Sequence, residues 1–154
     1  MRWSWKIAIV AGIPVRVHAT FFLLLIWIFW SHLARGQAVG QAMEGVGLVL
    51  SIFGCVVLHE FGHALTAKRY GVATRDITLF PIGGVARLER IPEKPIQEIA
   101  VALAGPAVNM VIASVLMAVL SLGPPLDFRN PAILERSFLA KLLIINLFLA
   151  IFNL

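Results

Sequence analysis

The sequence predicts an α-helical, polytopic membrane protein with about four transmembrane helices and short β-strands on the cytoplasmic side. Of its 154 residues, 60% are hydrophobic and 14% are charged, and the mean hydropathy is +0.91. This balance is typical of membrane proteins. A helix needs roughly 20 residues to cross a hydrocarbon core of about 30 Å. The apolar segments of about that length are approximately Val17–Leu33, Val46–Ala67, Ile99–Leu122 and Ser137–Leu154.

The basic residues predict an orientation in the membrane, and they do not form a patch for nucleic acid. The chain has 13 Lys and Arg against 8 Asp and Glu, a net charge of +5. Three basic residues lie in the N-terminal segment and six in the loop between the second and third apolar segments, against four elsewhere. Cytoplasmic loops carry such an excess. We therefore expect a multi-pass protein of the cell membrane whose N-terminus and middle loop are cytoplasmic, with no nucleic-acid partner.

The stretch before the first apolar segment predicts two short strands. Its hydrophobic residues nearly alternate on both sides of a turn at Ala11–Pro14, as in a β-hairpin. Trp3 and Trp5 suit a position at the membrane–water interface, where such rings are enriched. We expect this hairpin on the cytoplasmic side.

The second apolar segment contains His59-Glu60-Phe61-Gly62-His63, the most informative feature of the chain. An acid at the centre of a membrane helix costs about 2.5–3.5 kcal/mol, so three ionisable groups in one short stretch indicate a bound ion. Residues four apart share a helix face, and His59 and His63 can therefore both bind one Zn²⁺. Glu60 is placed to accept a proton from a metal-bound water. The alternative, a chance match on a solvated helix, fits poorly with this apolar setting. The motif does not fix the metal, because two imidazoles also suit Co, Ni and Cu.

Cys55 shares that helix face, being four residues before His59. It lies about 12 Å from His63 along a straight helix. The two side chains cannot reach one ion with bonds near 2.0–2.3 Å. We therefore expect Cys55 to be a packed small residue.

The loop after this segment predicts a second β-hairpin. Strand-like residues 71–80 and 85–90 flank a turn at Pro81-Ile82-Gly83-Gly84. One interpretation is an ordinary surface hairpin. The stretch 79–85 is, however, very apolar for a tip in water, and we expect it to dip into the bilayer beside the metal. Irregular backbone is tolerated there only against protein or a wet cavity.

The third apolar segment contains Gly105, Pro106 and Asn109. A Gly-Pro pair permits a kink and close approach of a neighbouring helix. Asn109 adds a polar group at about mid-depth. It either forms a hydrogen bond between helices or orients substrate or a metal-bound group, and chemistry alone does not decide between the two.

Together these motifs resemble the site-2 protease family of intramembrane zinc metalloproteases. The resemblance rests on HEFGH at 59–63, LFPIGGVARL at 79–88, AGPAVN at 104–109 and NLFLAIFNL at 146–154, in matching order. The opening GIPVRVHATF at 12–21 is similar to the prokaryotic branch, whose members often carry cytoplasmic CBS domains. The resemblance covers nearly the whole chain.

The resemblance implies one Zn²⁺ per chain, cleavage in or near a transmembrane helix of a substrate protein in the lipid bilayer, and roles for particular residues. His59 and His63 would be metal ligands and Glu60 the general base. The active site would be lined by Asn109, Gly105 and Pro106. The hairpin would engage an unwound substrate by strand addition, through Phe80, Pro81, Gly83 and Gly84.

The family's third zinc ligand is an aspartate in a Leu-Asp-Gly type motif that follows the Asn-containing stretch. No such motif precedes Leu154. We therefore expect the third ligand beyond Leu154, and a single metalloprotease core domain over residues 1–154 that is incomplete at its C-terminus. A pseudoprotease that binds membrane helices without cutting is one alternative. A metal transporter is another, but it leaves Glu60 and the hairpin without a role. The sequence is also compatible with a homo-oligomer.

Overall fold

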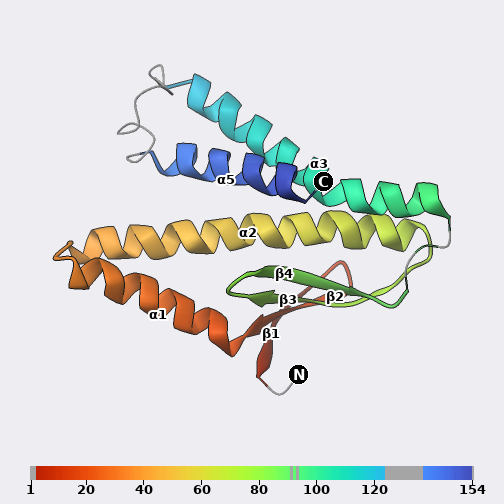
Figure 1. The fold of residues 1–154 in the computed structure, drawn as a ribbon, viewed down its shortest axis with the longest axis horizontal. Helices are drawn as coiled ribbons and strands as arrows, with labels where there is room; N and C mark the ends of the chain where they lie inside the picture. The colour runs from red at the N-terminus through yellow and green to blue at the C-terminus, as the bar shows by residue number, and fades with distance from the viewer. Residues whose placement is uncertain (1–2, 91, 93, 124–136, 154) are drawn as a thin grey trace.

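Four helices follow the four predicted apolar segments (Figure 1). They are α1 (Ala19–Ala34), α2 (Val39–Arg69), α3 (Pro95–Ser121) and α5 (Phe138–Phe152). The structure, a computed structural model, describes residues 3–90, 92, 94–123 and 137–153. Most of the loop between the predicted third and fourth segments lies outside this range, as does Leu154. The basic residues of that loop were counted in predicting the orientation.

Two of these helices are long and apolar enough to cross a membrane, namely α2 with 31 residues and α3 with 27. The apolar helices α1 and α5 have 16 and 15 residues. At a rise of about 1.5 Å per residue each is at most roughly 24 Å long, less than a hydrocarbon core of about 30 Å. The helical fold is therefore confirmed, with two helices long enough to span a membrane and two shorter apolar helices among the described residues. The four predicted transmembrane helices remain a prediction.

The helix starts differ from the predicted ones for local reasons. The first helix begins at Ala19 because Val17 and His18 belong to a strand, and the His18 imidazole accepts a hydrogen bond from Thr20 N as an N-terminal cap. The second begins at Val39, well before the apolar stretch. There the Gln41 side chain accepts a hydrogen bond of 3.1 Å from Ala38 N, which satisfies a free donor at the helix start.

Both predicted hairpins are present, and they form one four-stranded sheet in the order β1-β2-β3-β4. The strands are β1 (Ser4–Val10), β2 (Ile13–His18), β3 (Thr74–Phe80) and β4 (Gly83–Leu88). The pairs β1/β2 and β3/β4 are antiparallel, and β2 pairs with β3 in parallel. The second turn is tighter than predicted, because Gly83 and Gly84 belong to β4.

The parallel pairing is explained by a common buried face. Val15 lies opposite Ile77 and Val17 opposite Leu79, and all four side chains are buried. Alternate residues of a strand point to one face, so this register gathers the apolar side chains of both strands. Phe61 of α2 packs in the same core.

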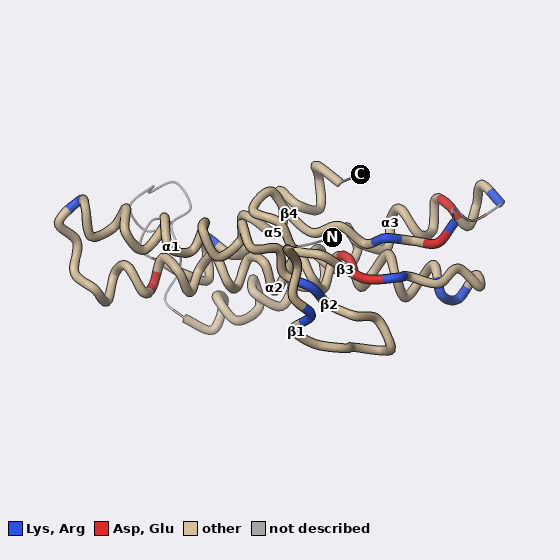
Figure 2. The backbone as a smooth tube through the Cα atoms, turned by 90° about the horizontal axis from the view of Figure 1, so that it is seen from below, with Lys and Arg blue, Asp and Glu red and all other residues tan. Residues whose placement is uncertain are grey.

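Helix α2 lies in the middle of the molecule. Figure 1 shows the sheet and α1 on one side of it, and α3 and α5 on the other. Figure 2 shows the charged residues mainly near the sheet and near the end of the molecule where α2 ends and α3 begins. Because α2 lies between α3 and the sheet, its side chains can contact both.

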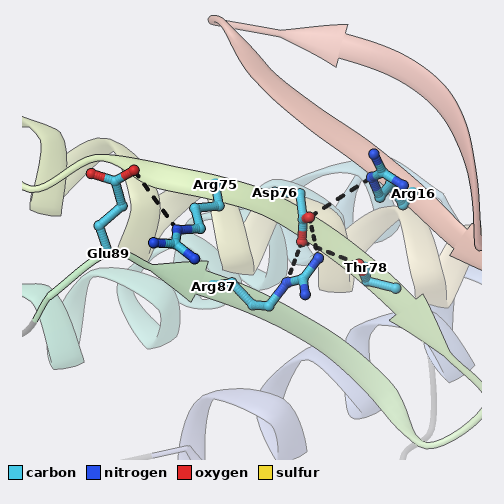
Figure 3. A network of polar contacts seen from close by, with 6 residues as sticks. All are labelled: Arg16, Arg75, Asp76, Thr78, Arg87 and Glu89. Atoms are coloured by element: carbon cyan, nitrogen blue, oxygen red, sulfur yellow. Dashed lines mark hydrogen bonds and ion pairs between the residues drawn. The ribbon is translucent and has the colours of Figure 1, made fainter. Parts of the chain in front are cut away.

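One buried carboxylate, Asp76 of β3, joins three strands (Figure 3). Asp76 is 6% exposed. Arg87 of β4 donates to both of its oxygens, with Nε 2.7 Å from Oδ1. The Thr78 hydroxyl donates to Oδ1 at 3.3 Å, and Arg16 Nε of β2 lies 3.7 Å from Oδ2. A buried charge is stable only when it is paired in this way.

We expect this pairing to make stability depend on acid pH. The hydrogen bonds from Arg87, together with its charge, the Thr78 hydroxyl and the Arg16 charge, hold the pKa of Asp76 below its ordinary value of 3.8. The unfolded chain therefore binds a proton more readily than the folded one, and the stabilisation is present above pH 3.8 and lost as the pH falls further. Melting temperatures in detergent should fall with acid more steeply for the wild type than for Asp76→Asn. Equal slopes would contradict the assignment.

Candidate metal centre

The histidine-containing turn of α2 lies where α2 meets α3. Gly62 makes this contact possible, because a Cβ there would lie 2.6 Å from Ala104 O and 2.9 Å from Val108 Cγ2. Any side chain at this position would push the two helices apart. The glycine within the predicted motif therefore brings α3 against the two histidines.

The two imidazoles converge on one point. His59 Nε2 and His63 Nε2 are 3.0 Å apart. His63 Nδ1 lies 2.7 Å from Val101 O in α3. A carbonyl oxygen only accepts hydrogen bonds, so Nδ1 carries the proton and the Nε2 lone pair points towards His59. The hydrogen bond from Nδ1 to the Val101 carbonyl fixes the orientation of the ring, as the corresponding bond does in metal-bound histidines.

This geometry fits a zinc ion. At Zn–N distances of about 2.0–2.1 Å, two nitrogens of a tetrahedral site are roughly 3.3 Å apart, close to the observed 3.0 Å between the Nε2 atoms. His59 is 5% exposed, and its Nδ1 has no hydrogen-bond partner among the described residues. Within the same residues, no group of three His, Cys, Asp or Glu side chains could hold an ion. Among the described residues, His59 and His63 are thus the two candidate ligands at this point.

Glu60 lies between the histidines and the sheet. Its Oε2 accepts a hydrogen bond of 3.0 Å from Ala86 N of β4. A Cβ on Gly84 would lie 2.9 Å from both Glu60 Cγ and Val56 Cγ1. Only glycine at this position lets β4 come so close, so the strand forms a wall beside the carboxylate.

Helix α3 closes the other side with backbone and with Asn109. A Cβ on Gly105 would lie 2.7 Å from His59 Nε2 and 2.6 Å from His63 Cε1, and closer still to His63 Nε2. Asn109 is fully buried and close enough to interact with the His59 imidazole. Neither of its polar atoms reaches hydrogen-bond geometry with another described residue. A buried amide in this state costs free energy unless something else binds it. Pro106 is also buried.

The other predicted site residues are placed as follows. Gly84 of the hairpin set lies directly against the histidine-bearing helix. Phe80 lies against the His18 ring, with 5.1 Å between ring centroids. Pro81 and Gly83 flank Ile82, whose side chain is 99% exposed. Cys55 is buried, and Asn146 Nδ2 donates to its sulfur at 3.4 Å, in agreement with the expected packing role.

Three groups at or near the site are absent from the sequence-based prediction. Two are backbone atoms, the carbonyl of Val101 and the N–H of Ala86. Any residue provides such atoms, so no residue type marks them. The third is Asp76, which is isolated in the sequence from its partners Arg16 and Arg87 and becomes a paired group only in the sheet.

Two converging imidazoles and a carboxylate next to them in sequence, set among apolar helices, fit a metallopeptidase of the membrane. The chain belongs to one family of this class, Peptidase family M50, whose pattern it matches over residues 47–128. It is 37% identical over 119 residues to a zinc metalloprotease of Methanocaldococcus jannaschii, covering 77% of this chain and 33% of that protein. It is 38% identical over 149 residues to a protein of Synechocystis sp. also named as a zinc metalloprotease, covering 93% of this chain and 38% of the relative.

A solved structure gives the same result. The Site-2 Protease from Methanocaldococcus jannaschii superposes with a TM-score of 0.72 at 33% identity, over 97% of this chain and 63% of that chain. The resemblance to the site-2 proteases is thereby confirmed. The chain spans about a third of the length of the curated relatives it matches.

Proposed function

We propose that the protein carrying this chain is an intramembrane zinc metalloendopeptidase that hydrolyses a peptide bond in or near a transmembrane helix of a substrate protein. The observation that carries the proposal is the convergence of His59 Nε2 and His63 Nε2 at 3.0 Å, with Glu60 next in sequence to His59. Membership of family M50 supports it. Residues 1–154 would form a single metalloprotease core domain.

In this proposal His59 and His63 hold the ion, and the Val101 carbonyl keeps the His63 ring oriented. Zinc, when bound, supplies a Lewis acid that lowers the pKa of water and polarises the scissile carbonyl. Glu60 accepts the proton of the attacking water and passes it to the leaving amine. Asn109, Gly105 and Pro106 line the active site, and the free polar atoms of Asn109 orient the substrate. A third protein ligand, an aspartate of a Leu-Asp-Gly type motif, comes from outside these 154 residues.

The hairpin β3–β4 engages the substrate in this proposal. β4 is the last strand of the sheet and lies beside Glu60, so an unwound substrate segment can add to it by backbone hydrogen bonds. Phe80, Pro81, Gly83 and Gly84 shape that strand and its turn. In this proposal all four apolar helices are membrane-embedded, with α2 and α3 long enough to span the bilayer by themselves and the shorter α1 and α5 crossing where it is locally thinner. The N-terminus is cytoplasmic, and the hairpin tip dips into the bilayer from that side.

The metal is tested by replacing the histidines in pairs. We expect His59→Ala/His63→Ala to lose the zinc that the wild-type protein carries, measured by elemental analysis after purification, because both ligands are gone. The double variant His18→Ala/His32→Ala removes the same number of imidazoles from outside the site and should keep the zinc. His18 bonds to Thr20, and His32 to the Ile28 carbonyl. Equal zinc in wild type and the His59/His63 variant contradicts the proposal.

A second candidate, a pseudoprotease that binds membrane helices without cutting them, is favoured by one observation. Among the described residues no third metal-binding side chain joins the two histidines. The two functions differ in one measurement, cleavage of a co-expressed membrane substrate. Zinc binding without cleavage in the protein that carries this chain supports the pseudoprotease.

A further inference from the structure

We propose that Asp76 is a positioning residue for Glu60. By holding Arg87, it fixes the register of β4 so that the Ala86 N–H meets the Glu60 carboxylate. The inference rests on the proposed function, because it assigns Asp76 to the reaction that Glu60 serves. Asp76 itself would touch neither substrate nor metal.

The first step is the register of the β3/β4 pair. Asp76 lies opposite Arg87, and Ile77 opposite Ala86. Arg87, which pairs with Asp76, is therefore next in sequence to Ala86, whose N–H bonds to Glu60. Figure 3 shows Asp76 on β3 and Arg87 on β4 pointing towards each other.

The second step is the direction of the Ala86 N–H. In an antiparallel strand the N–H and C=O of one residue point to the same edge, and consecutive residues alternate between edges. β4 has β3 on one edge only, and the Ala86 N–H meets Glu60 on the other. A slip by one residue would turn the N–H of Val85 or Arg87 to that edge and reverse the side chains of the strand.

The third step is that β4 needs a device to hold its register. Gly-rich strands specify register weakly, and β4 begins with Gly83 and Gly84. Val85 is 47% exposed, and Ala86 and Leu88 contact the core only as partly buried side chains, so packing holds β4 less firmly than it holds β3. The buried Asp76 supplies a specific contact that holds the register. Arg87 donates to both of its carboxylate oxygens, and Arg16 of β2 lies near it from the other side. Such a two-point, charge-assisted contact is among the stronger hydrogen-bonded pairs in proteins.

The sheet also contains a matched control. Arg75 of β3 and Glu89, the residue after β4, form a second ion pair, with 3.8 Å between Arg75 Nε and Glu89 Oε1. Their side chains are 70% and 52% exposed, and exposed pairs contribute little. Arg75→Gln therefore removes one positive charge next to Asp76 without removing a buried contact (Figure 3).

The experiment is a double-mutant cycle on cleavage of a membrane substrate. Asp76→Asn should lower kcat roughly tenfold, the scale found for partners that orient active-site groups, with little change in KM and with zinc retained. Ala86→Pro removes the N–H that bonds Glu60 and no bond to β3, and should lower kcat similarly. Since both act through one hydrogen bond, the double variant should be no slower than the slower single variant. Arg75→Gln should match the wild type.

A purely structural role gives different results. The losses of Asp76→Asn and Ala86→Pro would then multiply, or kcat would follow the melting temperature across all variants, and either outcome overturns the proposal. If Asp76→Asn does not fold, Arg87→Lys takes its place in the cycle, because it keeps the charge and loses the two-point contact.

Hydrogen exchange at the Ala86 amide separates this inference from the proposed function. Asp76→Asn should speed exchange of that amide at least several-fold, and Arg75→Gln should not. Unchanged exchange in Asp76→Asn overturns the positioning role. If the wild type shows no cleavage but the amide is protected in an Asp76-dependent way, the protease function fails and the control of β4 by Asp76 stands.

Discussion

Glu60→Gln should reduce cleavage of a membrane substrate by about 10²- to 10⁴-fold, the range for loss of a general base. Glutamine keeps the shape of the side chain and can still accept the 3.0 Å hydrogen bond from Ala86 N through its amide oxygen. It cannot take a proton from water at neutral pH. The fold and the site therefore remain, and only the proton transfer is lost.

The measurement is single-turnover cleavage together with zinc content. Zinc should stay at the wild-type level, because His59 and His63 are unchanged. Glu98, in the first turn of α3 and outside the site, gives the matched control, and Glu98→Gln should cleave at the wild-type rate. Undiminished cleavage by Glu60→Gln would refute its role as the base.

Gly105→Ala should abolish the metal site although it adds one methyl group. The added carbon would lie 2.7 Å from His59 Nε2 and 2.6 Å from His63 Cε1, and both rings would have to turn away. Zinc affinity should fall by at least the roughly 10–100-fold found when residues around metal ligands are changed, and cleavage should fall with it. The effect is steric, because alanine is favoured over glycine within a helix by about 1 kcal/mol.

Gly54→Ala is the control for this substitution. Gly54 lies in α2, and a Cβ there meets nothing within 4 Å. This variant should keep its zinc and its activity. A Gly105→Ala protein with full zinc content and full cleavage would show that the two imidazoles do not meet at this point of α3.

The site residues that could be predicted from sequence are polar residues within otherwise apolar segments. His59, Glu60 and His63 are polar groups in an apolar helix, and Asn109 is another in the next helix, so each requires an explanation on composition alone. The structure brings Asn109 and the histidines together at the contact of α2 with α3. The roles of these residues remain predictions, to be tested as above.

The helices and hairpins were predictable for a related reason. Long apolar runs and alternating patterns are local properties of the chain, and all four helices and both hairpins are found. Helix ends were less predictable, because hydropathy marks the lipid-compatible stretch and not the capping groups, such as Gln41, that start the helix earlier. The pairing of β2 with β3 joins residues about sixty apart, and nothing local to either strand encodes it.

That pairing has a consequence for how the protein is made. β2 precedes α1 and β3 follows α2, yet the two strands are hydrogen-bonded neighbours. In the proposed topology α1 and α2 therefore form a helical hairpin that enters and leaves the membrane on one face. β2 cannot pair with β3 before both helices have been synthesised, because β3 follows them in the chain. The strand beside Glu60 therefore joins the sheet only after α2 is complete.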